Sequence, residues 1–349
     1  MKRRFSLAVI LLAVLVLLAG CGGQSAEKSG SAAQDAQEPI KLRIVTEYSL
    51  GDKRGQIIQS FADQVNQDTN GRVLIEIYPD GQLFKSDAHY EAVSAGSVEM
   101  AVTHFGKGWP QIIPEITIMG AGVFEDSTHA LKALNGPLGD KLSQLLEEKA
   151  NTKLLAWTGA GNVDAMGCRS MQITKPEDLK GLRMRVPNAS QSALVEALGG
   201  APALINPSEA YLALQRGTID GVFSTTPSGV VHSKLYEVAE YWTRISISLG
   251  LEHGFVINQD TWEKIPADIQ QVIARAAQEK GKSLVTDLEA VADQEWAEVE
   301  KAGAQVYVVP REEVAKWRTL LAPARTATLE KILPKETVTE LLELAASAK

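Results

Sequence analysis

The sequence has few cysteines and, beyond its first 20 residues, no apolar run long enough to cross a membrane. Cys21 and Cys168 are the two cysteines among 349 residues. If Cys21 carries a covalent modification, Cys168 has no second cysteine to pair with. We therefore expect a fold without a structural disulfide. A chain of this length can bury a stable core without one. No later segment approaches the roughly 20 apolar residues that a membrane-spanning helix needs.

The motifs of several enzyme classes are also lacking. There is no GxSxG and no Walker loop, and the glycine pair at 159–161 fails to complete a GxGxxG fingerprint because Asp164 occupies its last position. The five histidines are scattered, with neither HExxH nor paired Cys/His spacing. We therefore expect no metal site and a protein that is not an enzyme.

The segment that opens the chain is typical of export. Three basic residues at positions 2–4 precede an apolar stretch that is too short and wrongly flanked for a transmembrane helix. LAGC at 18–21 resembles a bacterial lipobox, so we expect residues 1–20 to be a signal peptide and Cys21 to be lipidated. Residues 21–39 are rich in Gly, Ser, Ala and Gln, which suits a flexible tether. An ordinary secretory signal with a cysteine nearby is the alternative.

Positive charge is in deficit along the chain. The formal net charge is −8, and loss of the three basic residues of the signal segment would bring it to about −11. A protein this acidic is a poor partner for nucleic acids or anionic lipid surfaces. An anionic small ligand would therefore need positive charge placed locally for it.

From residue 40 onward, strand-like and helix-like hydrophobic periods alternate. The predicted strands are 40–48, 72–79, 99–105, 152–158, 182–186, 218–225, 245–258 and 304–309. The predicted helices are 55–71, 86–98, 127–149, 190–198, 206–217 and 266–303, followed by further helices to the end. The βαβαβ opening is how an open, mostly parallel sheet begins.

The helical pattern over 266–303 is broken only by Gly281. A helix of that length would measure about 55 Å, which exceeds the width of a small domain, so we expect it to lie across two domains. We predict an α/β protein of two lobes. Lobe I comprises 40–158 plus about 250–290, and lobe II comprises 159–249 plus about 291–349.

One predicted strand carries two arginines. In DLKGLRMRVP (178–187), apolar residues alternate with Arg183 and Arg185, and Pro187 ends the strand. Arg185 lies next to the strand end, where open α/β sheets bind ligands, and its guanidinium matches a carboxylate. From these residues alone, a ligand and a structural salt bridge are equally good partners for Arg185. We expect Arg183, deeper in the strand, either to extend its charged end to the solvent or to form a salt bridge.

Several segments together closely resemble the solute-binding subunits of tripartite ATP-independent periplasmic (TRAP) transporters, a family that includes C4-dicarboxylate-binding proteins. The similarity covers residues 40–300 in order. It rests on PEDLKGLRMRVPN (176–188), LGGAPALINPSEAYLALQRGTIDG (198–221), KLYEV (234–238), FADQVNQDTNGRVLIEIYPDGQL (61–83) and EAVSAGSVEMAV (91–102). The resemblance implies a Venus flytrap fold like that of periplasmic binding proteins, with a mixed sheet in each lobe and a long helix spanning both.

The resemblance assigns carboxylate binding to Arg185, which stands directly before Val-Pro as the family's arginine does. Other residues implied near the ligand are Tyr48, Glu91, His104, Trp157, Asn162, Asn206, Ser224 and Thr225. Each has a plainer alternative: Glu91 as a solvated helix residue, Tyr48 or Trp157 as core, and His104 as a surface histidine.

Two departures from the family pattern bear on the ligand. Many relatives carry a further ligand-facing arginine after the strand equivalent to 152–158, but here GAGNVDAMG (159–167) has none. FSTTP (223–227) also differs from the family's Asn-Pro or Glu-Pro pattern. A second carboxylate is then not clamped, so we expect a monocarboxylate rather than a C4-dicarboxylate.

The expected function is that of a monomeric, lipid-anchored binding protein in the periplasm or at the cell exterior. It would close on a small organic acid and deliver it to an ion-gradient-driven permease of two membrane subunits, without cofactor or nucleic acid. The binding protein of an ATP-driven importer is one alternative. Another is an extracytoplasmic enzyme in which Glu91, His104 and Arg185 perform acid–base chemistry. A structural lipoprotein would bind no small molecule.

Overall fold

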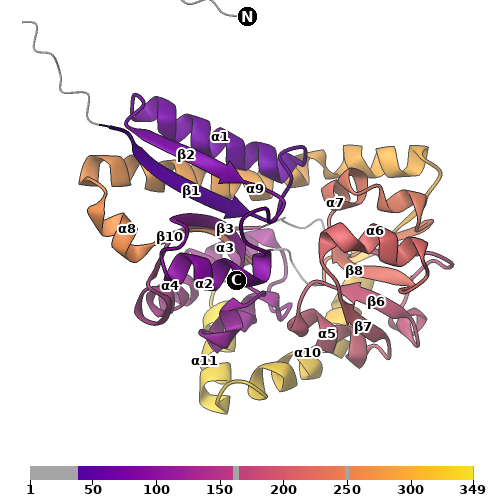
Figure 1. The fold of residues 1–349 in the computed structure, drawn as a ribbon. Coiled ribbons are helices and arrows are strands. Elements are labelled where there is room, and N and C mark those ends of the chain that lie inside the picture. The colour runs from indigo at the N-terminus through magenta and orange to yellow at the C-terminus, as the bar shows by residue number, and fades with distance from the viewer. Residues whose placement is uncertain (1–37, 160–164, 248–250, 349) are drawn as a thin grey trace, which may run out of the picture. The chain divides into compact units, whose positions relative to one another are not determined.

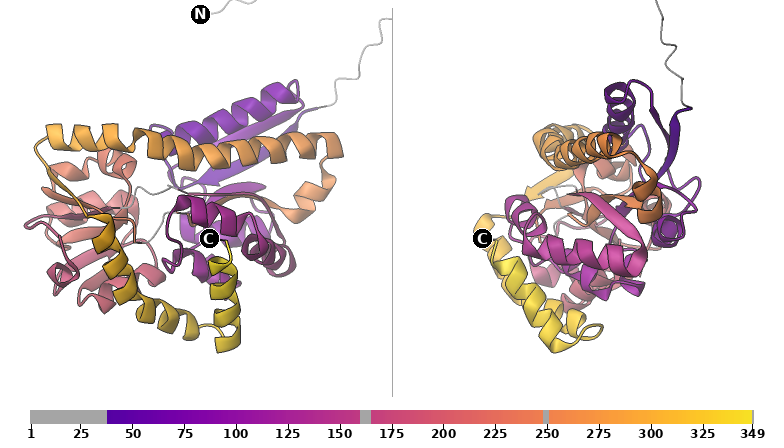
Figure 2. Two further views of the ribbon diagram at one scale, coloured as in Figure 1. Left: turned by 180° about the vertical axis from the view of Figure 1, so that it is seen from behind. Right: turned by 90° about the vertical axis from the view of Figure 1, so that its left-hand side faces the viewer.

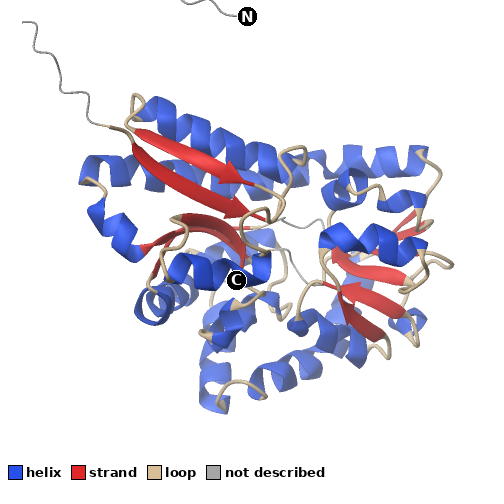
Figure 3. Cartoon of the chain, viewed as in Figure 1, coloured by secondary structure: helices blue, strands red, loops and turns tan. Residues whose placement is uncertain are grey.

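The computed structural model of the chain describes residues 38–159, 165–247 and 251–348. From Glu38 onward the chain forms one compact unit. It contains two mixed β-sheets, each flanked by helices, which make the two lobes of an α/β fold (Figures 1 and 3). The expected two-lobed architecture is confirmed. The predicted signal peptide, Cys21 and Asn162 lie outside the described residues.

The sheet of the first lobe has five strands in the order β2-β1-β3-β10-β4. They are β1 (Ile40–Thr46), β2 (Val73–Tyr78), β3 (Met100–His104), β4 (Thr152–Thr158) and β10 (His253–Asn258). The first three pair in parallel, as the βαβαβ opening predicts, and β10 lies antiparallel between β3 and β4. All residues of β3 and β10 are buried, because both strands are central and covered on both faces.

Helices cover both faces of this sheet. They are α1 (Lys53–Asp68), α2 (His89–Ser94), α3 (Ser127–Leu134), α4 (Pro137–Ala150) and α8 (Gln259–Lys264). Asp52 begins α1 as its N-cap, with its side chain accepting the amide hydrogen of Arg54. Because α1 directly follows the loop after β1, this cap fixes the loop at the carboxyl end of the strand.

The sheet of the second lobe has six strands in the order β11-β9-β5-β8-β6-β7. They are β5 (Ala165–Cys168), β6 (Arg183–Val186), β7 (Ala201–Leu204), β8 (Gly221–Thr225), β9 (Tyr241–Arg244) and β11 (Gln305–Val308). Between them lie α5 (Ala189–Ala197), α6 (Pro207–Gln215) and α7 (Pro227–His232). β6 pairs in parallel with β7 and β8, so the carboxyl ends of these strands meet at one edge of the sheet.

Long helices connect the lobes. α9 (Ala267–Lys301) packs on α1 and β4 through its first half and on α7 through its second (Figure 2). Ile273 and Leu284 belong to a first-lobe core, whereas Trp296 belongs to a second-lobe core. The predicted long helix therefore spans both lobes. None of the helices in the described residues is long and apolar enough to cross a membrane.

The end of the chain departs from the predicted lobe boundaries. α10 (Arg311–Glu330) packs on α5 in the second lobe, but α11 (Lys335–Ala346) packs on α3 and α4 in the first. Val338, Leu341 and Ala345 lie on one face of α11 and are buried in the first-lobe core. Residues 291–349 are thus divided between the lobes instead of belonging wholly to lobe II.

Some element predictions need correction. The helix expected over 127–149 is two helices, because Gly136 and Pro137 start α4 anew. The strand expected over 245–258 is confined to β10, and β9 precedes it. The four-residue strands β5 and β7 were not predicted, since segments so short carry little periodic signal.

Candidate ligand-binding site

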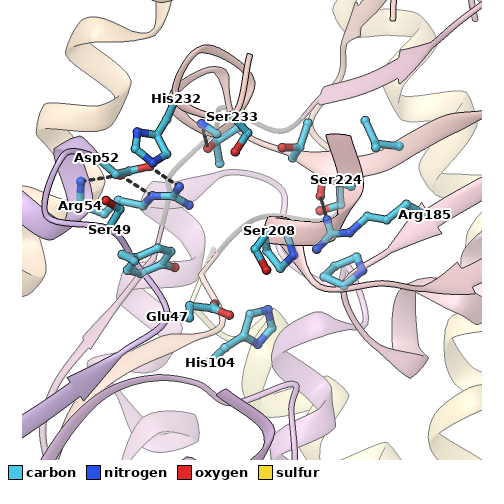
Figure 4. A pocket seen from close by; sticks show the side chains of 18 of the residues that line it. Glu47, Ser49, Asp52, Arg54, His104, Arg185, Ser208, Ser224, His232 and Ser233 are labelled. Atoms are coloured by element: carbon cyan, nitrogen blue, oxygen red, sulfur yellow. Dashed lines mark hydrogen bonds and ion pairs between the residues drawn. The ribbon is translucent and has the colours of Figure 1, made fainter. Parts of the chain in front are cut away.

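A cavity of about 190 Å³ lies between the edges of the two sheets. Its first-lobe wall comes from the loops after β1 and β3 and from the start of β10, and its second-lobe wall from β6, β8, α6 and α7 (Figure 4). Its polar lining includes Glu47, Tyr48, Asp52, Arg54, His104, Lys107, Arg185, Gln191, Ser208, Ser224, Thr225, His232, Glu252 and His253. The volume is below the usual range for drug-sized ligands, so the cavity suits a smaller molecule.

Arg185 is the buried cation of the second-lobe wall, with 5% of its surface exposed. Its Nε donates to the carbonyl oxygen of Ile205 at 2.8 Å and its Nη1 to that of Ser224 at 3.4 Å. No carboxylate of the described residues lies within ion-pair distance of it. Burial lowers the pKa of Arg185 to about 10, so the guanidinium still carries its charge at neutral pH. A positive charge is thus fixed at the cavity, and no acid of the part of the chain that the structure describes forms an ion pair with it.

Arg183 behaves differently although it lies on the same strand. Its guanidinium makes a two-point contact with the carboxylate of Asp220, at 2.7 and 3.0 Å, and its side chain is 49% exposed. Of the two expectations for Arg183, the salt bridge is confirmed.

Ser224 brings a less usual backbone conformation to the same wall. It lies at the end of β8 with a φ of 55°, in the left-handed region that residues other than glycine and asparagine rarely adopt. Two residues later, the Thr226 hydroxyl caps α7 by accepting the amide hydrogen of Gly229. The chain therefore turns sharply at the cavity and presents Ser224 and Thr225 to it.

Glu47 and Lys107 form an ion pair on the first-lobe wall. Lys107 Nζ lies 2.5 Å from Glu47 Oε2, and the two side chains are only 8% and 13% exposed. Burial alone would raise the pKa of Glu47, but the charge of Lys107 brings it well below its usual value. Glu47 directly follows β1, and Lys107 comes shortly after β3, so two parallel strands that are neighbours in the sheet bring the pair together.

Two histidines border this pair. Strand pairing places His253 opposite His104, with ring centroids 4.5 Å apart, and His253 Nε2 lies 2.5 Å from the Tyr48 hydroxyl. Burial lowers the pKa of both imidazoles, that of His104 well below its usual value. The Gly106 amide donates to His104 Nδ1 at 3.0 Å, so in the neutral ring the hydrogen is on Nε2. Both rings are therefore neutral at neutral pH.

A second ion pair lies farther along the cavity. Arg54 binds both carboxylate oxygens of Asp52, and its guanidinium lies 4.2 Å from the ring centroid of Tyr48. Burial would raise the pKa of Asp52, but Arg54 lowers it below its usual value. Figure 4 shows His232 of the second lobe beside this pair. The positive charge of Arg54 is consequently neutralised by the carboxylate of Asp52.

Glu252 connects the two lobes at the cavity. Its carbonyl oxygen accepts the amide hydrogen of Phe105 in the first lobe. Its carboxylate accepts from Asn188 at 3.0 Å and Gln191 at 3.3 Å, both at the start of α5. Because α5 begins just after β6, this contact ties the segment behind Arg185 to the first lobe.

The structure brings five of the predicted site residues to the cavity: Arg185, Tyr48, His104, Ser224 and Thr225. Three others lie elsewhere. Glu91 is exposed on α2 and accepts a hydrogen bond from Tyr90, while Trp157 is 7% exposed and packs on Phe105 in the core. Asn206 precedes α6 as its N-cap and is exposed, and the following Pro207 and Ser208 line the cavity instead.

A profile of the family described as bacterial extracellular solute-binding protein, family 7, matches residues 44–331. The chain belongs to this family. The C4-dicarboxylate-binding periplasmic protein of Rhodobacter capsulatus is 27% identical over 298 residues, covering 84% of this chain and 88% of that protein. The sialic acid-binding periplasmic protein of Vibrio cholerae is 26% identical over 258 residues, covering 72% and 77%.

Solved structures agree on the fold. A TRAP periplasmic solute-binding protein from Rhodoferax ferrireducens, with bound malonate, superposes with a TM-score of 0.80 at 22% identity. The superposition covers 88% of this chain and 98% of that one. The family profile and the curated relatives confirm the resemblance that the sequence suggests, and the solved structure agrees with it in fold.

Sequence reasoning missed several residues that line the cavity of this solute-binding protein. They are Glu47, Asp52, Arg54, Lys107, Glu252 and His253. Glu47 and Lys107 follow the carboxyl ends of strands, so the strand-end rule applied to every strand would have found them. His253 escaped because it starts an antiparallel strand. Among the described residues, no three His, Cys, Asp or Glu side chains are placed to hold a metal ion.

Proposed function

We propose that the protein captures a small organic monocarboxylate in the cavity between its lobes, with Arg185 as the carboxylate-binding residue. It would deliver this acid to the membrane permease of a TRAP transporter, driven by an ion gradient. Acylation of Cys21, anchoring to a bacterial membrane and a monomeric state belong to the same proposal. Membership in the family gives no support to an ATP-driven importer or to an enzyme.

The observation that carries the proposal is the state of Arg185. A buried guanidinium satisfied by two carbonyl oxygens keeps donors for a planar anion, and a carboxylate can accept from two of them at once. An interaction of this kind between desolvated charges is strong, and losing one partner of such a pair typically costs 2–5 kcal/mol.

The charges around the cavity support one carboxylate instead of two. Three basic side chains of the described residues, apart from the histidines, line it: Arg54, Lys107 and Arg185. Asp52 holds Arg54 and Glu47 holds Lys107 at 2.5 Å each. Among these three, Arg185 is the one without a carboxylate partner in the described residues, so it is available to an incoming anion. The relatives' names point to ligands with one carboxylate, such as sialic acid, and with two, so the residues of this chain must decide between them.

Replacing Arg185 tests the proposal directly. Wild-type protein screened against mono- and dicarboxylates by thermal unfolding should show at least one large rise in melting temperature, because a ligand bound only to the native state stabilises it. Arg185→Ala should lose that rise, with binding weakened at least about 30-fold, the lower end of the cost of breaking such a pair.

Arg183→Ala is the matched control, since it removes an arginine from the same strand but outside the cavity. It should leave the rise intact. Equal losses in the two variants, or no response of the wild type to any organic acid, would contradict the proposal. Conversion of the bound acid by the purified protein would indicate an enzyme instead.

A further inference from the structure

We infer that Glu47 selects for a hydroxylated acid: the ligand carries its carboxylate at Arg185 and presents at least one hydroxyl hydrogen to the Glu47 carboxylate on the opposite wall. This inference rests on the proposed function of the same cavity and adds the class of acid that it takes. It also assigns Glu47 and Lys107 as a pair that discriminates against a second carboxylate.

The acceptor capacity of Glu47 is the first support. A carboxylate offers about four lone-pair positions, and among the described residues Lys107 Nζ is the one close donor to Glu47. His253 Nε2 lies at a longer distance, 3.6 Å from Oε1, and its closer contact is with the Tyr48 hydroxyl at 2.5 Å. The cavity therefore contains a buried, ionised carboxylate with unused lone pairs that can accept a hydrogen bond from the ligand.

The position of Glu47 is the second support. Figure 4 shows Glu47 and His104 on one side of the cavity and Arg185 on the other. A carboxylate of the ligand placed beside Glu47 would gain no binding free energy there, because two negative charges brought together in a poorly hydrated site repel each other. A hydroxyl group of the ligand is uncharged, so it can donate its hydrogen to the Glu47 carboxylate without electrostatic repulsion.

The neighbouring His104 fits the same kind of ligand. Its Nδ1 already accepts from the Gly106 amide, so the neutral ring carries its hydrogen on Nε2. Glu47 accepts and His104 donates, and a hydroxyl group can satisfy both at once because it is donor and acceptor. Together, the two residues can hydrogen-bond to the hydroxyl groups along one side of a hydroxylated carbon chain.

Lys107 completes the discrimination. It is the first-lobe cation nearest to Glu47, and it is 8% exposed with its charge held by that carboxylate. A ligand's second carboxylate would have to displace Glu47 from Lys107 and leave Glu47 buried without its partner, which is costly. The Glu47–Lys107 pair thus favours hydroxyls and disfavours dicarboxylates.

The test is calorimetric titration of the mature protein with acids matched in chain length. Lactate, propanoate and malonate form a three-carbon set, and gluconate, hexanoate and adipate form a six-carbon set. In at least one set, the hydroxylated acid should bind about tenfold or more tightly than both others, as expected for a hydrogen bond to a charged group. Equal or tighter binding of the unsubstituted acid or the dicarboxylate in both sets would overturn the inference.

Glu47→Gln should change the order of binding. It frees Lys107, so the variant should lose the preference for the hydroxylated acid and bind the dicarboxylate more tightly than the wild type does. Glu91→Gln, an exposed acid outside the cavity, should behave as the wild type. If Glu47→Gln does not fold, Glu47→Gln with Lys107→Gln removes both charges and should abolish the preference without the gain for dicarboxylates. A preference that survives these changes would refute the role of Glu47.

The two proposals fail in different ways. If acids bind through Arg185 without regard to hydroxyl groups, the role of Glu47 is wrong and the proposed function stands. If no acid binds the wild type, the proposed function falls and the inference falls with it.

Discussion

Arg183 and Arg185 are two positions apart on β6 and have opposite fates. Asp220 neutralises Arg183 at the surface, whereas Arg185 is buried with carbonyl oxygens as its partners. A buried charge without a counter-ion is costly, and a protein keeps such a group where a ligand supplies the opposite charge. Both residues are arginines on one strand, so it is their position relative to the strand end that sets the different role of each.

His89 offers a test of the electrostatics at the scale of one residue. It is fully buried, and its Nε2 donates to the Phe84 carbonyl. Burial lowers the pKa of His89 from 6.5 to about 4. Between these two values the unfolded state binds a proton that the folded state does not, so stability falls as pH falls.

His89→Gln should therefore flatten the dependence of stability on pH. The wild type should lose about 3 kcal/mol of unfolding free energy through this group between pH 7 and pH 4, and the variant should not. Urea unfolding at several pH values measures the difference. The other buried histidines and acids contribute to both proteins alike, so parallel curves for the two would refute this account of His89.

At the scale of elements, the long helix α9 was predictable and the short strands were not. Its apolar period extends over nearly the whole helix of 35 residues, and the helix continues through Gly281, the one break in that pattern. By contrast, β5, β7 and β9 each have four residues, and their places in the sheet are set by neighbours far away in sequence. The strand-end rule could have placed Glu47 and Lys107 at the cavity, but it could not show that they form an ion pair, because strand pairing brings together residues 60 positions apart.

Gly281 lies where α9 packs tightly on β4. A Cβ at this position would lie 3.0 Å from Ala156 Cβ and 3.1 Å from the Trp157 carbonyl oxygen. Gly281→Val should destabilise the protein by about 1–3 kcal/mol, the usual cost of overpacking. Ala290→Val, exposed on the same helix, should cost no more than about 0.7 kcal/mol, the range of helix propensity. Similar losses in denaturant unfolding would contradict the close approach.

At the scale of the whole molecule, the family resemblance predicted the two-lobed fold but not how the chain ends. The resemblance extends over residues 40–300, so it carried no information on α11, whose apolar face returns to the first-lobe core. The cavity could be placed in part from sequence, since Arg185, Tyr48, His104, Ser224 and Thr225 lie at or near strand ends. The contacts that Glu47 and Glu252 make there could not be predicted, because their partners lie 60 or more positions away in the sequence.

The two lobes are joined around the cavity by α9, by α10 and by the contacts of Glu252. A ligand held between Arg185 on one lobe and Glu47 on the other would add a further link across the same opening. Binding and closure would then be coupled, because the ligand completes its contacts only when both walls are close.

Native mass spectrometry of the protein as purified from its host tests the central claim most directly. The account predicts that wild-type protein carries one small acid with a mass of one carboxylate and one or more hydroxyl groups, and that Arg185→Ala, prepared in the same way, carries none. Arg183→Ala should retain it. The same adduct on Arg185→Ala, or a bound molecule without a carboxylate, would contradict the account.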